Sequence, residues 1–158
     1  MTRLEIFLLS LLLPITVHAA DLTGRIVSIA DGDTVTLLDQ SNQQHKIRLK
    51  GIDAPEAHQP FGQKSKANLG AIVFNKDVIA ECGKSDKYKR QICKVIIGSI
   101  DANLQQVKAG MAWHYKKYAN EQSPKDREDY EIAEFNAKLR RLGLWSESNP
   151  VPPWEWRK

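Results

Sequence analysis

Residues 22–53 read LTGRIVSIADGDTVTLLDQSNQQHKIRLKGID, and this stretch decides the fold. β-branched and aliphatic residues fill it, except where polar runs interrupt at 31–33 and 40–44. Apolar runs separated by turn-forming residues are typical of short antiparallel strands. The stretch therefore predicts a three-stranded meander with strands at about 23–30, 34–39 and 45–51.

The second turn of this meander sets which residues of its strands face one another. A turn centred on Ser41 and Asn42 pairs the flanking strands so that Asp33 lies opposite the neighbourhood of Lys50. Asp53 follows Lys50 closely in the chain. We therefore expect two acidic segments, about twenty residues apart in sequence, to meet at one end of a sheet.

The rest of the chain predicts one further hairpin and three helices. Apolar spacing and turn residues place the two hairpin strands at 77–82 and 91–97. The same reasoning places the first two helices at 60–74 and 102–109. The third helix has the clearest start, because Ser123 can cap it and Pro124 takes its first position; Gly143 is its expected end. Five strands with late helices favour a mainly β fold with α-helices, a five-stranded OB-fold Greek-key barrel with three helices.

The N-terminal residues 1–19 have the pattern of a signal peptide. Arg3 precedes an apolar run over 6–13, and the small residues that follow place cleavage after Ala19. A membrane anchor is the alternative, but the run is shorter than the roughly 20 residues of a bilayer span, and Pro14 interrupts it. We expect a secreted or periplasmic protein without stable membrane association after cleavage. Residues 20–158 would form a single domain with an extended C-terminal tail.

Two features bear on partners and compartment. The formal net charge is +4, which favours polyanions such as nucleic acids but is also a common way to stay soluble. Cys82 and Cys93 are the two cysteines of a chain directed to an oxidising compartment, and they fall on facing strands of the second hairpin. We expect a disulfide between them, with two buried thiols as the alternative.

The end of the chain, from Glu147 to Lys158, contains three prolines. Proline cannot continue a strand ladder or a helix interior, so this segment is expected to be an extended strap. Trp154 and Trp156 would pin the strap to the body of the domain, because buried aromatic rings contribute mainly through packing.

Carboxylates and arginines combine in three short segments, at 31–34, 48–56 and 86–90. Carboxylates at turns can hold a hard divalent cation, a further carboxylate can activate water, and guanidiniums can bind a phosphate whose charge grows during attack. Taken singly, Asp-Gly-Asp is an ordinary tight turn, and Arg48 is an ordinary partner for nearby acids. A bend at Gly51 would let Arg48 and Asp53 face the space beside Asp33.

In these segments, Asp-Gly-Asp-Thr, Ile-Arg-Leu-Lys-Gly-Ile-Asp-Ala-Pro-Glu and Asp-Lys-Tyr-Lys-Arg follow one another in an order and spacing that resemble the staphylococcal nuclease-like, or thermonuclease, family. A weaker resemblance extends from Thr23 to Trp145. It implies an OB barrel with three helices and calcium-dependent endonuclease cleavage of DNA and RNA. Oxygen-only ligands agree with calcium and also suit magnesium or manganese.

The resemblance also implies roles for individual residues. At the cation site, Asp33 and Asp53 would be direct ligands, the Ala54 carbonyl would be a further ligand, and Asp31 would lie in the outer shell. Arg48 and Arg90 would bind the phosphate, and Glu56 would be the general base or water-positioning carboxylate. The nucleotide site would be lined by Lys87, Tyr88 and Tyr118. Lys89 replaces the glycine that usually precedes the arginine, which could alter the loop or add a phosphate contact.

Two other functions fit parts of the sequence. A non-catalytic OB module could bind single strands through its lysines and tyrosines, namely Lys84, Lys87, Tyr88, Lys116 and Tyr118. Loss of catalytic positions would mark such a module, whereas the acids and arginines named above are all present. A disulfide-stabilised interaction protein explains the signal peptide and cysteines but leaves the acids and arginines unused. We therefore expect a monomeric nuclease with DNA and RNA as substrates.

Overall fold

Consecutive antiparallel strands form most of the main sheet of this computed structural model, which describes residues 21–158; the predicted signal peptide lies outside the described residues. The strands are β1 Leu22–Ile29, β2 Thr34–Asp39, β3 Gln44–Leu49, β4 Ile52–Asp53, β5 Asp77–Ser85, β6 Gln91–Ile97, β7 Ile100–Asp101 and β8 Trp113–His114. The helices are α1 Gly62–Val73, α2 Ala102–Lys108, η1 Lys116–Glu121, α3 Pro124–Leu139, η2 Gly143–Ser146 and α4 Pro153–Trp156.

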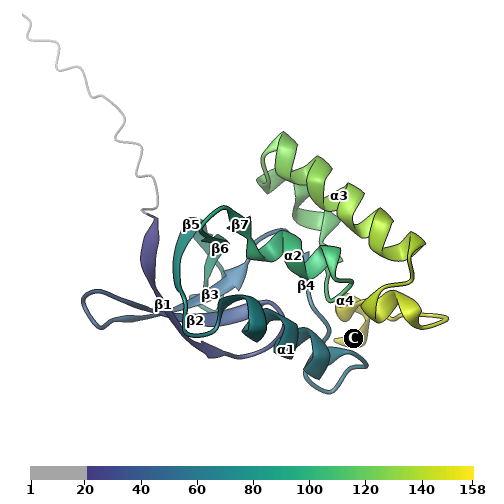
Figure 1. The fold of residues 1–158 in the computed structure, drawn as a ribbon, viewed down its shortest axis with the longest axis horizontal. Coiled ribbons are helices and arrows are strands. Elements are labelled where there is room, and N and C mark those ends of the chain that lie inside the picture. The colour runs from purple at the N-terminus through teal and green to yellow at the C-terminus, as the bar shows by residue number, and fades with distance from the viewer. Residues whose placement is uncertain (1–20) are drawn as a thin grey trace, which may run out of the picture.

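The order of the main sheet is β3-β2-β1-β5-β6-β7. Strand β3 also pairs with β6 in parallel, with Arg48 opposite Ile92, and this pairing closes the strands β1, β2, β3, β5 and β6 into a barrel (Figure 1). The expected five-stranded OB-type barrel with helices is therefore confirmed. Short strands β4 and β8 form a separate antiparallel pair beside it.

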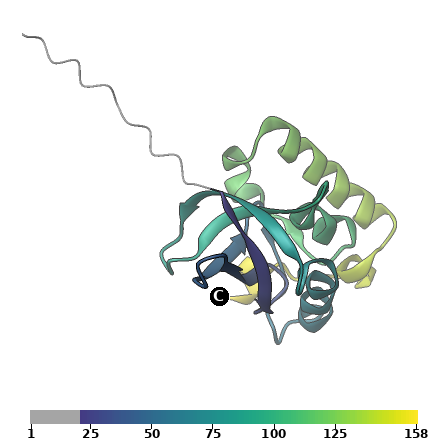
Figure 2. The same cartoon turned by 60° about the vertical axis from the view of Figure 1, so that its left-hand side comes forward.

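Alternating side chains of the strands fill the barrel. Position by position along β2 and β3, every second residue points inward, as the period of a strand requires. The inward side chains are fully or almost fully buried: Ile26, Val35, Leu37, Ile47, Leu49, Ala80 and Val95. Helix α1 packs on β1, and α2 packs on β6 and α3, so that the helices gather on one side of the barrel (Figures 1 and 2).

Helix α3 begins where the sequence predicts and ends earlier than expected. The Ser123 hydroxyl accepts a hydrogen bond from the Asp126 amide at 3.0 Å, and Pro124 is the first helical residue. The helix stops at Leu139 rather than near Gly143, because Arg141 adopts a left-handed φ of 52° that a continuing helix does not permit.

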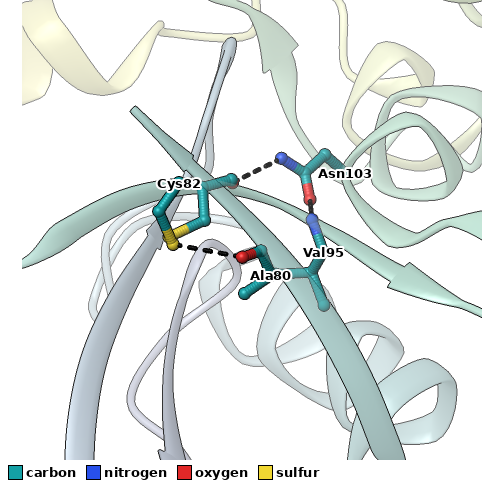
Figure 3. The surroundings of a disulfide bond; sticks show 5 residues. Ala80, Cys82, Val95 and Asn103 are labelled. Carbon is teal, nitrogen blue, oxygen red and sulfur yellow. Dashed lines mark hydrogen bonds between the residues drawn. A yellow bond between two sulfur atoms is a disulfide. The ribbon is translucent and has the colours of Figure 1, made fainter. Parts of the chain in front are cut away.

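The predicted disulfide is present and joins β5 to β6 at directly paired positions, Cys82 and Cys93 (Figure 3). Asn103 of α2 secures the same region: its side-chain oxygen accepts from the Val95 amide at 3.1 Å, and its nitrogen donates to the Cys93 carbonyl at 3.1 Å. The same nitrogen donates to the Lys50 carbonyl at 3.0 Å, so one buried amide ties α2 to β6 and to the residue that follows β3.

The C-terminal tail is not an extended strap throughout. Residues Pro153–Trp156 form the short helix α4, because Pro153 supplies the fixed φ that suits the first position of a helix. Trp154 packs as expected, whereas Trp156 is 46% exposed, so the expectation that both tryptophans pin the tail is wrong for Trp156. Within residues 21–158, no helix has the length and apolar character needed to cross a membrane.

Candidate active site

The β1–β2 turn, the β3–β4 segment and the β5–β6 loop surround one cavity of about 720 Å³. Every candidate cation, phosphate and nucleotide residue lines it: Asp31, Asp33, Arg48, Asp53, Ala54, Glu56, Lys87, Tyr88, Arg90 and Tyr118. Lys84 also lines this cavity, whereas Lys116 lies in a neighbouring pocket and pairs with Glu131. The three segments of the sequence therefore do meet in space.

The acidic turn between β1 and β2 is rigidly built. The Asp31 carboxylate accepts from the Asp33 amide at 3.0 Å, which closes the turn, and the Asp33 carbonyl accepts from the Leu49 amide at 2.7 Å. Asp33 therefore lies opposite Leu49 at the end of β3. This position agrees with the prediction that Asp33 faces the neighbourhood of Lys50. This pairing brings Asp33 to the segment that carries Asp53.

Gly32 is required in this turn because two elements pack closely against it. A Cβ at this position would lie 1.9 Å from the Ser65 hydroxyl of α1 and 2.8 Å from the Ala54 Cβ. The Gly32 carbonyl also accepts a hydrogen bond of 2.6 Å from the buried side chain of Gln106 in α2. Helices α1 and α2 thus hold the turn from behind and fix the direction of Asp33.

A single guanidinium joins the two candidate cation ligands. Arg48 contacts Asp33 at 2.9 Å and Asp53 at 2.8 Å, and all three side chains are largely buried. The contact depends on Gly51, whose φ of 77° lies in the left-handed region and redirects the chain between β3 and β4. The predicted bend at Gly51 and the shared orientation of Arg48 and Asp53 are confirmed.

Burial dominates the electrostatics of Asp33. Loss of solvent raises the pKa of this carboxyl to about 8, while Arg48 and the Ala54 amide, which donates to it at 2.6 Å, act in the opposite direction. The neighbouring acids Asp31 and Asp53 add repulsion that also raises this pKa. The neutral form of Asp33 is therefore favoured, and a further positive charge beside it would stabilise the ionised form.

The β5–β6 loop aims Arg90 through Asp86. One Asp86 oxygen accepts from the amides of Tyr88 and Arg90, and the other accepts from the Arg90 side chain at 2.7 Å. Burial opposes ionisation of Asp86, but these hydrogen bonds lower its pKa overall. Lys89 completes the turn with a left-handed φ of 63°, the position where the resemblance predicts glycine.

Aromatic side chains form the outer wall of the cavity. Tyr88 is 66% exposed and lies beside the Arg90 guanidinium, 5.4 Å from ring centre to Cζ. Tyr118 is 41% exposed and stands edge-on to Tyr115. Exposed rings of this kind can stack on bases, while Lys84 and Lys87 can approach phosphates.

Glu56 lies at the rim, where Arg157 of the C-terminal tail contacts it at 2.6 Å. The same guanidinium reaches Asp53 at 2.7 Å. Hydrogen bonding to Asp53 raises the pKa of Arg157 above its usual range, so its charge is permanent. No local pattern in the sequence pointed to Arg157, because its contact with Asp53 spans 104 residues.

Residues other than Arg157 also escaped sequence reasoning. Gln106 supports the acidic turn through its hydrogen bond to the Gly32 carbonyl. The apolar spacing of 102–109 predicts the helix that carries Gln106 but not this contact. Asp86 lies within a motif that sequence reasoning singled out, but its role in holding Arg90 depends on the closed loop. A carboxylate four residues before an arginine in a turn-rich loop was the available signal for Asp86.

The oxygen donors at the base of the cavity suit a hard divalent cation. Asp33 and Asp53 project from adjacent elements toward Arg48, and the Ala54 backbone lies beside them. Among residues 21–158, no group of three or more Asp, Glu, His or Cys side chains is placed so that it could hold a metal ion. A cation here would therefore combine the two carboxylates with the Ala54 carbonyl, water or substrate oxygens.

The geometry agrees with similarities to known proteins. Residues 46–147 match the family described as Staphylococcal nuclease homologue. An uncharacterized endonuclease of Haemophilus influenzae is 43% identical, over 100% of this chain and 88% of that protein. The micrococcal nuclease of Shigella flexneri is 36% identical, over 88% of this chain and 82% of that protein. The chain therefore belongs to the staphylococcal nuclease family and is a nuclease.

Proposed function

We propose that this chain is a secreted or periplasmic nuclease that uses a divalent cation, in the first place calcium, to hydrolyse DNA and RNA with water as the nucleophile. The observation that most supports this proposal is that one cavity is lined by Asp33, Arg48, Asp53, Glu56 and Arg90. The signal-like pattern of residues 1–19 supports export. A monomer without stable membrane association after cleavage is part of the same proposal.

The cation would be held by Asp33, Asp53 and the Ala54 carbonyl, with Asp31 in the outer shell. When bound, it offsets negative charge on the phosphate oxygens and makes water easier to deprotonate. Magnesium and manganese also accept all-oxygen ligands, so the proposal ranks calcium first among three hard cations.

The side chains of the cavity would carry the reaction itself. Glu56 accepts a proton from water, and the water oxygen forms a new bond to phosphorus. The bond from phosphorus to the leaving sugar oxygen breaks, and that oxygen takes up a proton from solvent water, while Glu56 later returns its own proton to solvent. Arg48 and Arg90 donate hydrogen bonds to the phosphate oxygens, and these bonds strengthen as negative charge develops during attack.

Contacts with the rest of the substrate would be independent of base sequence. Lys87 approaches the phosphates, while Tyr88 and Tyr118 offer exposed rings against which bases can stack. Phosphate contacts position a strand without reading its sequence, because every nucleotide carries the same phosphate. Both DNA and RNA fit such a site.

The first test is degradation of single-stranded DNA and RNA by the purified mature chain with calcium, with magnesium and with a chelator. We expect calcium-dependent cleavage that collapses in the Glu56→Gln variant, which keeps the size of the side chain but cannot accept the proton. Tight binding without cleavage under every metal condition would instead support a non-catalytic OB module. Cleavage that persists in the chelator would refute the role of the cation.

A further inference from the structure

Arg157, the penultimate residue, enters the cavity from the C-terminal tail. One of its nitrogens lies 2.7 Å from one Asp53 oxygen, and the other lies 3.3 Å from the second Asp53 oxygen. This second nitrogen also donates to Glu56 at 2.6 Å. One guanidinium therefore spans a candidate cation ligand and the candidate general base.

The tail is anchored so that Arg157 reaches these acids. Trp154 stacks on Tyr115, with ring centres 5.3 Å apart and planes inclined by 11°. The Gln59 side chain donates to the Val151 carbonyl, and Pro153 is buried. Both contacts lie upstream of Arg157, so the guanidinium can leave the acids while the tail stays docked.

A cation and this guanidinium require the same oxygen atoms. The Asp53 side chain is 1% exposed, and both of its oxygens accept hydrogen bonds from Arg157. Arg48 already occupies one of them as well. A divalent cation bound to Asp53 would meet the positive charge of Arg157 at close range, where repulsion in a buried site is strong.

We propose that Arg157 is a tethered, competing occupant of the cation site, held on Asp53 and Glu56 until a divalent cation displaces it. This inference rests on the cation site of the proposed function. Displacement frees Asp53 for the cation and Glu56 for water at the same moment. Arg157 is thus a positioning residue that couples loading of the cation to exposure of the general base.

The test is calorimetric titration of calcium into the mature chain without nucleic acid, comparing the wild type with Arg157→Ala, Arg157→Lys and Lys158→Ala. Lys158→Ala is the matched control, because this variant also removes one positive charge, at a residue that lines the neighbouring pocket. We expect about tenfold tighter binding in Arg157→Ala, typical of coupling between two sites. The calcium affinity of Arg157→Lys should lie between those of the wild type and Arg157→Ala, and that of Lys158→Ala should stay within about twofold of the wild type.

Thermal unfolding with and without calcium gives a second readout. Without calcium, Arg157→Ala should unfold at a lower temperature because Asp53 loses a partner, yet calcium should raise its unfolding temperature more than that of the wild type. A merely structural role would lower stability equally in both conditions and would overturn the proposal.

The outcomes separate this inference from the proposed function. Equal calcium affinity in the wild type and Arg157→Ala, weaker binding in Arg157→Ala, or equal tightening in Lys158→Ala would each overturn the role of Arg157 while leaving the cation site intact. Absence of calcium binding in every variant would overturn the cation site itself, and the competition with it.

Discussion

The two candidate phosphate-binding arginines are held in different ways. Arg48 is 12% exposed and fixed by two carboxylates, whereas the Arg90 side chain is 26% exposed and pairs with one carboxylate, that of Asp86. Asp86 fixes one edge of the Arg90 guanidinium and leaves its other donors available for the cavity. The shape of the group should therefore matter at Arg90 as much as its charge.

Replacing Arg90 with lysine tests this requirement. The ammonium keeps the charge but cannot hold both Asp86 and a phosphate through a planar fork, so we expect kcat to fall by about 100-fold. Steady-state cleavage of single-stranded DNA at saturating calcium measures the effect. Arg25→Lys, on the exposed side of β1, is the matched control. Near-normal turnover in Arg90→Lys would remove Arg90 from the mechanism.

If the proposed cation site is correct, Asp33 should make cation binding sensitive to pH. Burial raises the pKa of this carboxyl to about 8, so below that pH a proton should compete with a cation for Asp33. A cation must displace this proton, so calcium affinity should rise by about tenfold per unit as pH rises toward 8 and level off above it. Titrations in buffers of different ionisation enthalpy would report one proton released. A flat affinity from pH 6 to about 9 would contradict this linkage.

At the scale of elements, the β5–β6 hairpin connects the barrel to the Arg90 loop. Cys82 and Cys93 face each other at the base of this loop, and the strand register shifts between Cys82 and Lys84. The disulfide thus closes the segment that carries Asp86 and Arg90. A covalent closure at this position limits how far the loop can open in the unfolded chain.

Removing the disulfide should therefore lower the stability of the domain. Because the cysteines are 11 positions apart in the sequence, the double variant Cys82→Ala/Cys93→Ala should lose about 3 kcal/mol of unfolding free energy. Urea denaturation followed by circular dichroism measures this loss. The wild type with a reducing agent should show a similar change, while an unchanged midpoint in both would show that the disulfide does not stabilise the fold.

Elements with strong local signals could be predicted from the sequence. The strand at 34–39 and the start of α3 at Ser123 agree with the structure, because alternation and capping depend on neighbouring residues. The resemblance could single out Asp33 and Arg90 as candidate site residues because each lies within a short motif of neighbouring residues. Helix α4 and the contacts of Arg157 could not be found, because they depend on how the tail docks against Tyr115 and Asp53.

At the scale of the whole molecule, positive charge is not concentrated in the cavity. Six basic and six acidic side chains line it, and several basic groups are already paired with acids, as Arg48, Lys84 and Arg157 are. The formal charge of +4 for the chain is therefore distributed largely elsewhere. The cavity itself would therefore attract a nucleic acid only through its few unpaired basic side chains and through the divalent ion of the proposed function.

Salt dependence of binding measures how many charges engage the strand. Contacts of Arg48, Lys87 and Arg90 with about three phosphates predict a slope of about −2 for log affinity against log salt on single strands. Raising salt fourfold should then weaken binding by about 15- to 20-fold. Fluorescence anisotropy with the Glu56→Gln variant in calcium avoids cleavage during the measurement. A slope near zero would mean that stacking on Tyr88 and Tyr118 dominates binding, whereas a much steeper slope would place further phosphates on basic side chains outside the cavity.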